Sequence, residues 1–474
     1  MISVQERYQR VRHDLSVIGQ EHVLQFWPTL TPAQQMLLLQ QLEAIDPAWI
    51  SELAELVKKQ QQAEQVAKPE LQPFPVIPLA MTAAEEDRNR RAVAAGEELL
   101  RQGQVAVVVV AGGLGSRLGK EEPKGMLAVS PISRRSLFQL HTEKLIALER
   151  RMARRLPFLI MTNEANHTAT VDFFAKHHFF GKRAEDFFFF SQASLPTFDH
   201  QAKLLMSSVS SLALSPDGHG GLLTALQQNH LLETLHSAGV ELLYYFQVDN
   251  ALCRIADPAF LGHHTLQQAE VSSKTVAKRN PEEKVGVFCI RDDKAAVVEY
   301  SELDEALRHQ QDEHGRLRFL QGSIAIHIFN LSFLQRLLQQ GVRLPYHLAH
   351  KKVPHIDQKG HPVAPIYENG YKLEQFIFDV LPYARRSIVV ETSRAVEFSP
   401  IKNFNGLDSP ETAGRALIEL YARWLEALGV TVPRDRHGFS LHPIEISPLF
   451  ALDEEELRGK IPSGLTISGD TLLE

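Results

Sequence analysis

The residues best suited to chemistry lie in one stretch of the chain, VAVVVVAGGLGSRLGKEEPKGM. Gly112, Gly113 and Gly115 follow the run of Val and Ala, and glycine lets a ligand approach the main chain closely. Arg117 and Lys124 in the same stretch add fixed positive charge to an anion site built from backbone N–H groups. The composition therefore predicts a phosphate-binding loop.

Two well-known nucleotide motifs do not match this loop. A P-loop needs Ser or Thr after its Gly-Lys pair, whereas Glu121 follows Lys120 here. The dinucleotide fingerprint GxGxxG needs a third glycine where Leu118 stands, so a nicotinamide-dependent oxidoreductase is a weaker alternative. Pro123 would interrupt a dinucleotide-binding helix, so the loop is predicted to be extended. A tight strand-to-helix turn without a ligand is the structural alternative.

A carboxylate is predicted to face this loop. The apolar run LLYYFQV ends at Asp249 and Asn250, and open α/β sheets place ligands at the carboxyl ends of their strands. Mg²⁺ prefers one or two carboxylates together with substrate phosphates and waters, so Asp249 suits this ion. The alternative is an Asx turn that merely ends the strand.

A second glycine-rich loop, SPDGHGGL, contains Gly218 and His219 and could lie flat against a base or ribose; a plain surface turn is its alternative. Lys372 and Lys402 stand beside apolar segments, where a solvated surface lysine is the ordinary explanation. None of the 21 histidines belongs to an HExxH motif.

The elements that must position these residues alternate along the middle of the chain. Strand-like runs are predicted at residues 105–111, 158–162, 187–192 and 242–248, and helical patterns at residues 137–155, 168–177 and 222–238. This alternation predicts an α/β fold with a mostly parallel sheet and helices on both faces.

The flanking regions have a different character. The pattern predicts helices over residues 3–58, an extended Pro- and Gln-rich connector over 59–81, and a further helix through Leu99 and Leu100. Three segments near 274–277, 285–290 and 295–300 predict an antiparallel appendage to the sheet. A long amphipathic helix is predicted at 409–428, followed by a short mixed tail.

The composition of the 474 residues excludes several classes of partner. A formal charge of −7 gives no general attraction to nucleic acid or to an anionic membrane. Only Cys253 and Cys289 occur, without metal-ligand spacing, which predicts two buried thiols in a reducing cytoplasm. No apolar stretch approaches the length that spans a bilayer, so we expect a soluble cytoplasmic protein.

Ordered segments over most of the chain resemble the eukaryotic-type UDP-sugar pyrophosphorylases, and most closely the UDP-N-acetylglucosamine pyrophosphorylases. They include AGGLGSRLGKEEPKGM, SPDGHGGLLTAL, FQVDNAL, KRNPEEKVGVF, NGYKLEQFIFDV and EFSPIKNFNG. The resemblance implies a helical N-terminal region (1–98), a Rossmann-like GT-A-type nucleotidyltransferase core with a mixed, mostly parallel sheet (99–390) and a small C-terminal domain (391–474). It also implies a uridylyltransferase that makes UDP-sugar and pyrophosphate from UTP and a sugar 1-phosphate, with Mg²⁺.

The resemblance implies a role for each candidate residue. The triphosphate would be bound by Gly112, Gly113, Gly115, Arg117 and Lys124, the nucleotide by Gln192, Gly218 and His219, the sugar by Gly286, Glu299 and Ser323, Mg²⁺ by Asp249, and the sugar phosphate by Lys402, with Lys372 as a further phosphate contact. These roles agree with the chemistry, because two polyanions repel each other and need protein cations and a metal before in-line attack. The ionised sugar phosphate is itself the nucleophile, so no protein nucleophile is required.

Three positions depart from the acetylglucosamine branch. Leu114 stands where that branch has Gln, His219 replaces Asn, and Ser323 replaces an Asn that contacts the sugar. N-acetylglucosamine 1-phosphate is the expected substrate, and glucose 1-phosphate or a broad range of sugars is the alternative. A non-catalytic nucleotide-sugar-binding protein is a second alternative, and the protein is expected to be a monomer or a homodimer.

Overall fold

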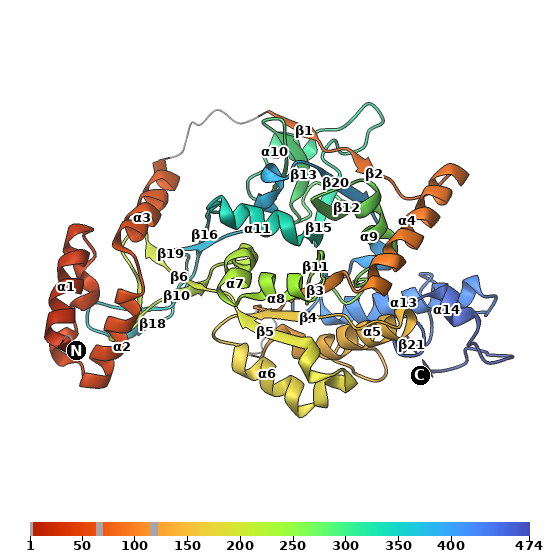
Figure 1. Cartoon of the computed structure of the whole chain (residues 1–474), viewed down its shortest axis with the longest axis horizontal. Helices are drawn as coiled ribbons and strands as arrows, with labels where there is room; N and C mark the ends of the chain where they lie inside the picture. Colours follow the sequence, from red (N-terminus) through yellow and green to blue (C-terminus); the bar gives the residue numbers. More distant parts are fainter. Residues whose placement is uncertain (1–2, 63–69, 114–121) are drawn as a thin grey trace. The chain divides into compact units, whose positions relative to one another are not determined.

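The computed structural model describes residues 3–62, 70–113 and 122–474 (Figure 1). The chain forms two compact units. Unit 1 comprises Met1–Pro69, Gln192–Gly221 and Arg343–Ile377, and unit 2 comprises Glu70–Ser191, Leu222–Val342 and Phe378–Glu474. The N-terminal helices therefore share a unit with two later segments. The division into three consecutive domains stays a prediction.

In the described part of unit 1, α-helices combine with short strands. The helices are α1 (Val4–Val17), α2 (Pro32–Glu43) and α3 (Pro47–Gln62), and Ser3 and Thr31 close capping boxes at the first two. The strands are β6 (Ser194–Pro196), β7 (Phe198–Asp199), β8 (Met206–Ser208), β9 (Ser211–Leu212), β10 (Leu214–Pro216), β16 (His347–Lys351), β17 (His355–Ile356), β18 (Pro362–Val363) and β19 (Gly370–Glu374). One hydrophobic cluster joins the helices to the strands, including Leu38, Leu53 and Phe198. The helices predicted over residues 3–58 are confirmed.

Unit 2 is built on a mixed, mostly parallel sheet in the order β2-β20-β12-β15-β11-β3-β4-β5, with β1, β13 and β14 attached. The strands are β1 (Leu71–Pro73), β2 (Val76–Ile77), β3 (Val105–Val110), β4 (Phe158–Thr162), β5 (Phe187–Ser191), β11 (Leu242–Gln247), β12 (Val271–Ala277), β13 (Val287–Arg291), β14 (Lys294–Val298), β15 (Gln321–Asn330) and β20 (Ser387–Glu391). β11, β3, β4 and β5 run parallel, whereas β15 is antiparallel to both of its main neighbours, β11 and β12. The predicted fold class is confirmed.

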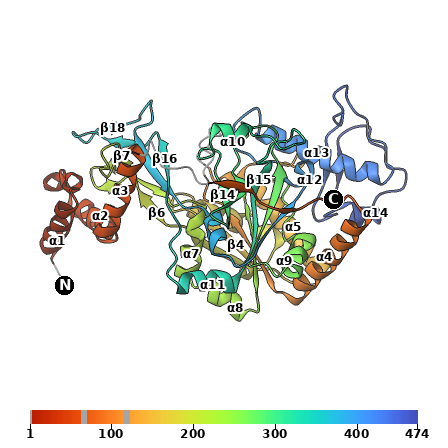
Figure 2. The same cartoon turned by 90° about the horizontal axis from the view of Figure 1, so that it is seen from above.

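Helices cover both faces of this sheet. The α-helices described in unit 2 are α4 (Ala83–Gln102), α5 (Leu137–Met152), α6 (His167–Lys176), α7 (Leu222–Gln228), α8 (Leu231–Ser237), α9 (Pro258–Leu266), α10 (Glu305–His309), α11 (Leu331–Gln339), α12 (Arg394–Glu397), α13 (Pro410–Ala427) and α14 (Glu454–Arg458). Figure 2 shows α7, α8 and α11 on one side of the sheet and α4, α5 and α9 on the other. A further small sheet pairs β21 (Ile444–Ile446) with β22 (Thr471–Leu473). The long helix predicted at 409–428 is confirmed as α13.

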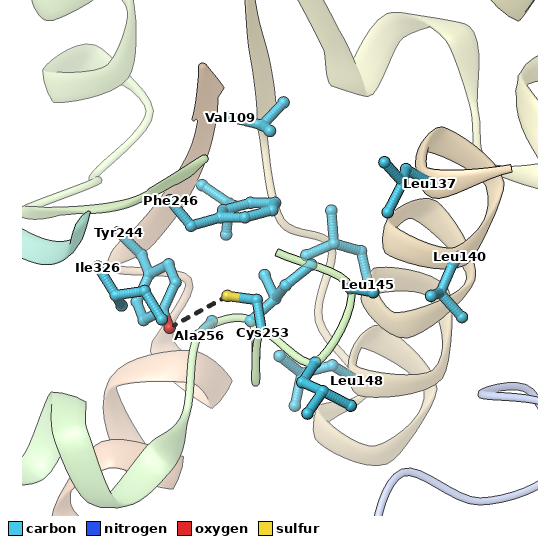
Figure 3. Close-up of a cluster of buried hydrophobic side chains, with 14 of the residues drawn as sticks. Val109, Leu137, Leu140, Leu145, Leu148, Tyr244, Phe246, Cys253, Ala256 and Ile326 are labelled. Atoms are coloured by element: carbon cyan, nitrogen blue, oxygen red, sulfur yellow. Dashed lines mark hydrogen bonds between the residues drawn. The ribbon is translucent and has the colours of Figure 1, made fainter. Parts of the chain in front are cut away.

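One large hydrophobic cluster extends from the sheet across α5 to α13 and the β21–β22 sheet. Figure 3 shows Val109 and Phe246 of two neighbouring strands on the side of the sheet towards α5, and Tyr244 beside Cys253; all three side chains are fully buried. Cys253 lies in this cluster, and Cys289 is buried elsewhere in unit 2, so the prediction of two buried thiols is confirmed.

The prediction of an antiparallel appendage is correct for the β13–β14 hairpin but wrong for residues 274–277. These residues belong to β12, an interior strand between β20 and β15. The sequence of β12, VSSKTVA, looks half-polar, yet its first six residues are all buried. Lys274 made this segment look solvent-exposed in the sequence, because a buried lysine is rare unless it is paired.

Two other elements differ from their predicted bounds. The pattern at 222–238 predicts one helix, but α7 and α8 are separated at His230, whose φ of 53° lies in the left-handed region. The connector predicted from residue 59 begins later, because α3 continues to Gln62. Its described part forms β1 and β2, which pair with β13 and β20, and its prolines are compatible with these marginal positions.

No helix in the described part of the chain is both long and apolar enough to cross a membrane.

Candidate functional site

Lys124 and Asp249 meet at the carboxyl ends of two neighbouring parallel strands. β3 and β11 pair in register up to Val110 and Gln247, so the segments that follow them emerge side by side. The Lys124 Nζ lies 3.0 Å from the Asp249 Oδ2 and donates a second hydrogen bond of 3.2 Å to the Ile401 carbonyl. The two side chains are 18% and 13% exposed, so this pair sits at the surface end of the strands rather than inside the core. The structure thus brings the predicted cation and carboxylate together.

Lys124 is held by a short turn that requires glycine. Lys124 begins a single 3₁₀ turn (Lys124–Met126), and its N–H donates to the Gly113 carbonyl at 3.2 Å. A Cβ on Gly125 would lie only 2.2 Å from the buried ring of Phe138. The described part of the loop carries no α-helix before α5 begins at Leu137, which agrees with the extended loop predicted from Pro123.

Two asparagines that the sequence reasoning missed anchor the start of the glycine loop. The Asn163 Nδ2 donates to the Gly112 carbonyl at 2.5 Å, and the Asn166 Nδ2 donates to the Ala111 carbonyl at 2.9 Å. Each asparagine side chain also accepts a hydrogen bond from the other's backbone N–H at 2.9 Å. Their position after β4, the next parallel strand, was the available signal. Of the other predicted loop residues, Leu114, Gly115 and Arg117 lie outside the described residues.

Helix α5 holds the main chain around Asp249 through the buried His141 and the half-buried Lys144. The His141 Nε2 donates to the Val248 carbonyl at 2.9 Å, and burial lowers the pKa of His141 to about 3, so the ring is neutral. The Lys144 Nζ donates to the Ala251 and Cys253 carbonyls at 2.7 and 2.9 Å. Burial lowers the pKa of Lys144 to about 8. Sequence reasoning missed both residues; two basic side chains within the apolar face of a helix were the available signal.

The segment that carries Lys402 is bonded to the same loop. The Ile401 N–H donates to the Asp249 carbonyl at 3.0 Å. The Asn250 side chain donates from its Nδ2 to the Glu397 carbonyl at 2.8 Å, and its Oδ1 accepts from the Ser399 N–H at 3.0 Å. Lys402 therefore follows directly on a backbone that is tied to Asp249.

The three residues assigned to the sugar are also brought together. The Ser323 N–H donates to the Gly286 carbonyl at 2.8 Å, where β15 meets the β13–β14 hairpin. A Cβ on Gly286 would lie 2.9 Å from the Glu299 Oε1, so any larger residue would displace the carboxylate. Glu299 follows directly after β14.

The predicted nucleotide residues belong to unit 1. Gly218 has a φ of 85°, and a Cβ there would lie 2.5 Å from the Gln375 carbonyl oxygen, so both backbone conformation and space demand glycine. The His219 Nδ1 accepts a hydrogen bond of 3.1 Å from the Ile377 N–H. Burial, with a smaller contribution from His347, lowers the pKa of His219 to about 4. His219 is therefore neutral, with its proton on Nε2.

Gln192 stands directly after β5 and is buried beside Asp217, a carboxyl that sequence reasoning did not single out. Asp217 is 4% exposed, and its Oδ1 has no hydrogen-bond partner among the described residues. Burial raises the pKa of Asp217 to about 7, although a hydrogen bond from Gln192 opposes the shift. Lys372 lies on β19, and its predicted phosphate contact stays a prediction.

Comparisons with known proteins agree with this arrangement. A sequence model of the family described as UTP–glucose-1-phosphate uridylyltransferase matches residues 50–409. The chain is 36% identical to the UDP-N-acetylhexosamine pyrophosphorylase-like protein 1 of Homo sapiens, over 95% of this chain and 94% of the relative. It is 36% identical to the UDP-N-acetylglucosamine pyrophosphorylase of Saccharomyces cerevisiae, over 87% of this chain and 90% of that one.

A solved structure shows the same fold. The crystal structure of the uridine diphosphate N-acetylglucosamine pyrophosphorylase from Trypanosoma brucei in complex with inhibitor matches with a TM-score of 0.83 and 26% identity. The match covers 100% of this chain and 99% of the other. The chain therefore belongs to the UTP–glucose-1-phosphate uridylyltransferase family.

Proposed function

We propose that the protein transfers the uridylyl group of UTP to N-acetylglucosamine 1-phosphate, releasing pyrophosphate and UDP-N-acetylglucosamine. The observation that carries this proposal is the Lys124–Asp249 pair at the carboxyl ends of β3 and β11. The acetylglucosamine preference is supported by the yeast and trypanosomal relatives, which are UDP-N-acetylglucosamine pyrophosphorylases and match over most of their lengths.

The protein's own groups suit this reaction electrostatically. The attacking sugar phosphate and the leaving pyrophosphate are both anions, so catalysis depends on positioned cations more than on covalent chemistry. Lys124 has its ammonium fixed by two hydrogen bonds, and Lys402 follows a backbone tied to Asp249. We infer that Lys124 compensates charge on the leaving pyrophosphate and Lys402 charge on the sugar phosphate. The sequence-based prediction that Arg117 contributes to the same charge compensation belongs to this proposal.

Asp249 has the donor chemistry that Mg²⁺ requires. Its side chain is 13% exposed and supplies hard carboxylate oxygens where substrate phosphates would lie. Across residues 3–62, 70–113 and 122–474 no cluster of three or more His, Cys, Asp or Glu forms a metal cage. Such a cage is unnecessary, since Mg²⁺ bound with a nucleotide keeps waters and takes oxygens from the phosphates. We infer that Asp249 holds Mg²⁺, which would neutralise phosphate charge.

A second candidate substrate is glucose 1-phosphate. It is favoured by Ser323, whose short hydroxyl replaces the expected amide, and by the description of the matching family. A cytoplasmic location and a monomeric or homodimeric state belong to this proposal as well.

The proposal is tested by pyrophosphate release. Purified protein with UTP and Mg²⁺ is offered a panel of sugar 1-phosphates, and release is expected with N-acetylglucosamine 1-phosphate. Asp249→Asn and Lys124→Met should each lower kcat by about 100-fold or more, because each removes a charge that acts on the transition state. Asp172→Asn and Lys176→Met, both exposed on α6, are the matched controls and should keep full activity.

The outcomes separate the alternatives. The absence of pyrophosphate release with every sugar 1-phosphate would refute the proposed enzymatic activity. UTP that raises the melting temperature without any pyrophosphate release would instead identify a nucleotide-binding protein. Protection by a nicotinamide cofactor, with none by UTP, would identify the oxidoreductase.

A further inference from the structure

Lys274 is an almost fully buried charged side chain near the site, and the proposed reaction does not use it. It projects from the interior strand β12, and the side chain is 2% exposed. Burying an ammonium is costly unless charges and hydrogen bonds compensate for the lost water, so its surroundings demand an explanation.

Two buried carboxylates surround this ammonium. The Lys274 Nζ lies 2.7 Å from the Asp257 Oδ2 and 2.6 Å from each carboxylate oxygen of Glu397. The two carboxylates are 7% and 1% exposed. The Thr392 hydroxyl adds a hydrogen bond of 2.9 Å to the Glu397 Oε2, and Arg254 lies 3.6 Å from the second oxygen of Asp257. Two cations thus balance two carboxylates.

Glu397 connects this cluster to the Lys402 segment. It is the last residue of α12, and its carbonyl accepts the hydrogen bond from the Asn250 side chain. From Glu397 the chain runs through Ser399, whose N–H donates to Asn250, to Ile401, which is bonded to Asp249 and Lys124. Lys274 therefore fixes the point from which the Lys402 segment leaves the core.

Asp257 connects the same ammonium to the other side of the site. It caps α9, accepting a hydrogen bond of 3.3 Å from the Ala259 N–H, and it ends the loop that starts at Asp249. The Tyr244 hydroxyl donates to the Arg254 carbonyl within this loop at 2.8 Å, and Figure 3 shows Tyr244 beside Cys253 of the loop. One side chain thus ties down both segments that meet at Asp249.

We propose that Lys274 is a positioning residue for the uridylyl transfer: it holds the Asp249 loop and the Lys402 segment at their working separation without touching substrate. This inference rests on the proposed function. Its physical basis is that misplacing a reacting group by about 1 Å can cost about 100-fold in rate.

The pKa shifts in this cluster indicate that Lys274 and Asp257 stay charged and paired at neutral pH. Burial by itself would lower the pKa of Lys274, but Asp257 and Glu397 outweigh it and the pKa is raised. Burial would raise the pKa of Asp257, but Arg254 and Lys274 outweigh it and hold that pKa below its ordinary value. Both groups therefore stay charged through the neutral range.

The test is Lys274→Met, which keeps the length of the side chain and removes the charge. We expect kcat to fall by about tenfold or more while the KM for UTP changes by less than about threefold, because the variant displaces groups that act on the transition state. The control is Lys182→Met. Lys182 is also buried, is bonded to Glu149 and lies 3.6 Å from Asp186. Among the described residues, no hydrogen bond or ion pair links these three side chains to the Asp249 loop or the Lys402 segment.

The control separates positioning from stability. Lys182→Met should lower the melting temperature and leave kcat within about twofold of wild type. A folded Lys274→Met protein with unchanged kcat would overturn the inference, as would equal losses of kcat in the two variants. If Lys274→Met does not fold, Thr392→Val tests the positioning role instead, because it removes one hydrogen bond to Glu397. This variant should lower kcat by about threefold at unchanged KM, and an unchanged kcat would overturn the inference.

Failure of this inference is distinguishable from failure of the proposed function. Wild-type protein that turns over, together with a fully active Lys274→Met variant, would refute only the positioning role. Wild-type protein that releases no pyrophosphate would refute the function itself.

Discussion

Asp217 is the residue in unit 1 whose ionisation the fold shifts into the neutral range. Its carboxyl is buried with an unbonded Oδ1 among the described residues, and a Cβ on the neighbouring Gly221 would lie 2.2 Å from that oxygen. Burial raises the pKa to about 7 from an ordinary value of 3.8. The folded protein therefore holds this proton more tightly than the unfolded chain does.

This difference predicts how stability depends on pH. The favourable contribution of the raised pKa is fully present below pH 4 and is lost as pH rises through about 7, at up to about 1.4 kcal/mol per pH unit. Asp217→Asn carries no titrating proton, so its melting temperature, followed by calorimetry from pH 4 to 8, should fall less than that of wild type. The exposed Asp172→Asn is the control. Parallel curves for Asp217→Asn and wild type would contradict the account.

Single residues were predictable where a strand end placed them. Asp249 and Lys124 could be predicted to meet because parallel strands deliver their following residues to one edge of the sheet. The roles of His141, Lys144 and Lys274 could not be predicted, because each is a polar side chain among the apolar residues of its helix or strand. Their roles depend on carbonyls and carboxylates more than 100 residues away or on other elements, and no local pattern records such partners.

Helices α4 and α9 illustrate how an element is positioned for the site. A Cβ on Gly262 of α9 would lie 1.7 Å from the Ala92 carbonyl oxygen of α4, and a Cβ on Gly96 would lie 1.9 Å from the Pro258 carbonyl oxygen. The two backbones therefore touch directly, and this contact fixes the helix that Asp257 caps. Because backbone cannot move aside as a side chain can, these glycines have no room for substitution.

We expect Gly262→Ala to lower the free energy of unfolding by about 1–3 kcal/mol or more, since the methyl group forces the two helices apart. Gly414→Ala in α13 is the control, because its Cβ would meet only the Val129 carbonyl oxygen at 3.5 Å, an ordinary contact. That control should be neutral or slightly stabilising. Differential scanning calorimetry measures both, and equal melting temperatures for Gly262→Ala and wild type would refute the close-contact explanation.

The elements themselves were largely predictable from periodicity. The observed bounds of β3, β4, β11 and α13 lie within about a residue or two of the predicted ones. Long apolar or amphipathic runs indicate the type of element clearly through their periodicity. β12 was missed as a sheet strand because Lys274 interrupts its apolar pattern, and the break between α7 and α8 depends on one left-handed residue, His230. Both wrong predictions have the same cause: the interactions that decide these structures involve residues far away in the sequence.

At the scale of the whole molecule, the site of unit 2 is assembled from three distant segments, the glycine loop, the Asp249 loop and the Lys402 segment. Sheet order brings the first two together, and hydrogen bonds from Asn250 and Ile401 attach the third. The family and the expected acetylglucosamine substrate were predictable because several ordered motifs occur along the chain. Glucose stayed an alternative because Leu114, His219 and Ser323 differ from the residues that the resemblance leads one to expect.

The central claim is the chemical identity of the products. The most direct measurement is phosphorus NMR of the protein incubated with UTP, N-acetylglucosamine 1-phosphate and Mg²⁺. The account predicts that the UTP and sugar phosphate signals decline together while a sugar nucleotide diphosphate and pyrophosphate appear in equal amounts. Unchanged UTP, or its breakdown to UDP and phosphate without a sugar nucleotide, would contradict it.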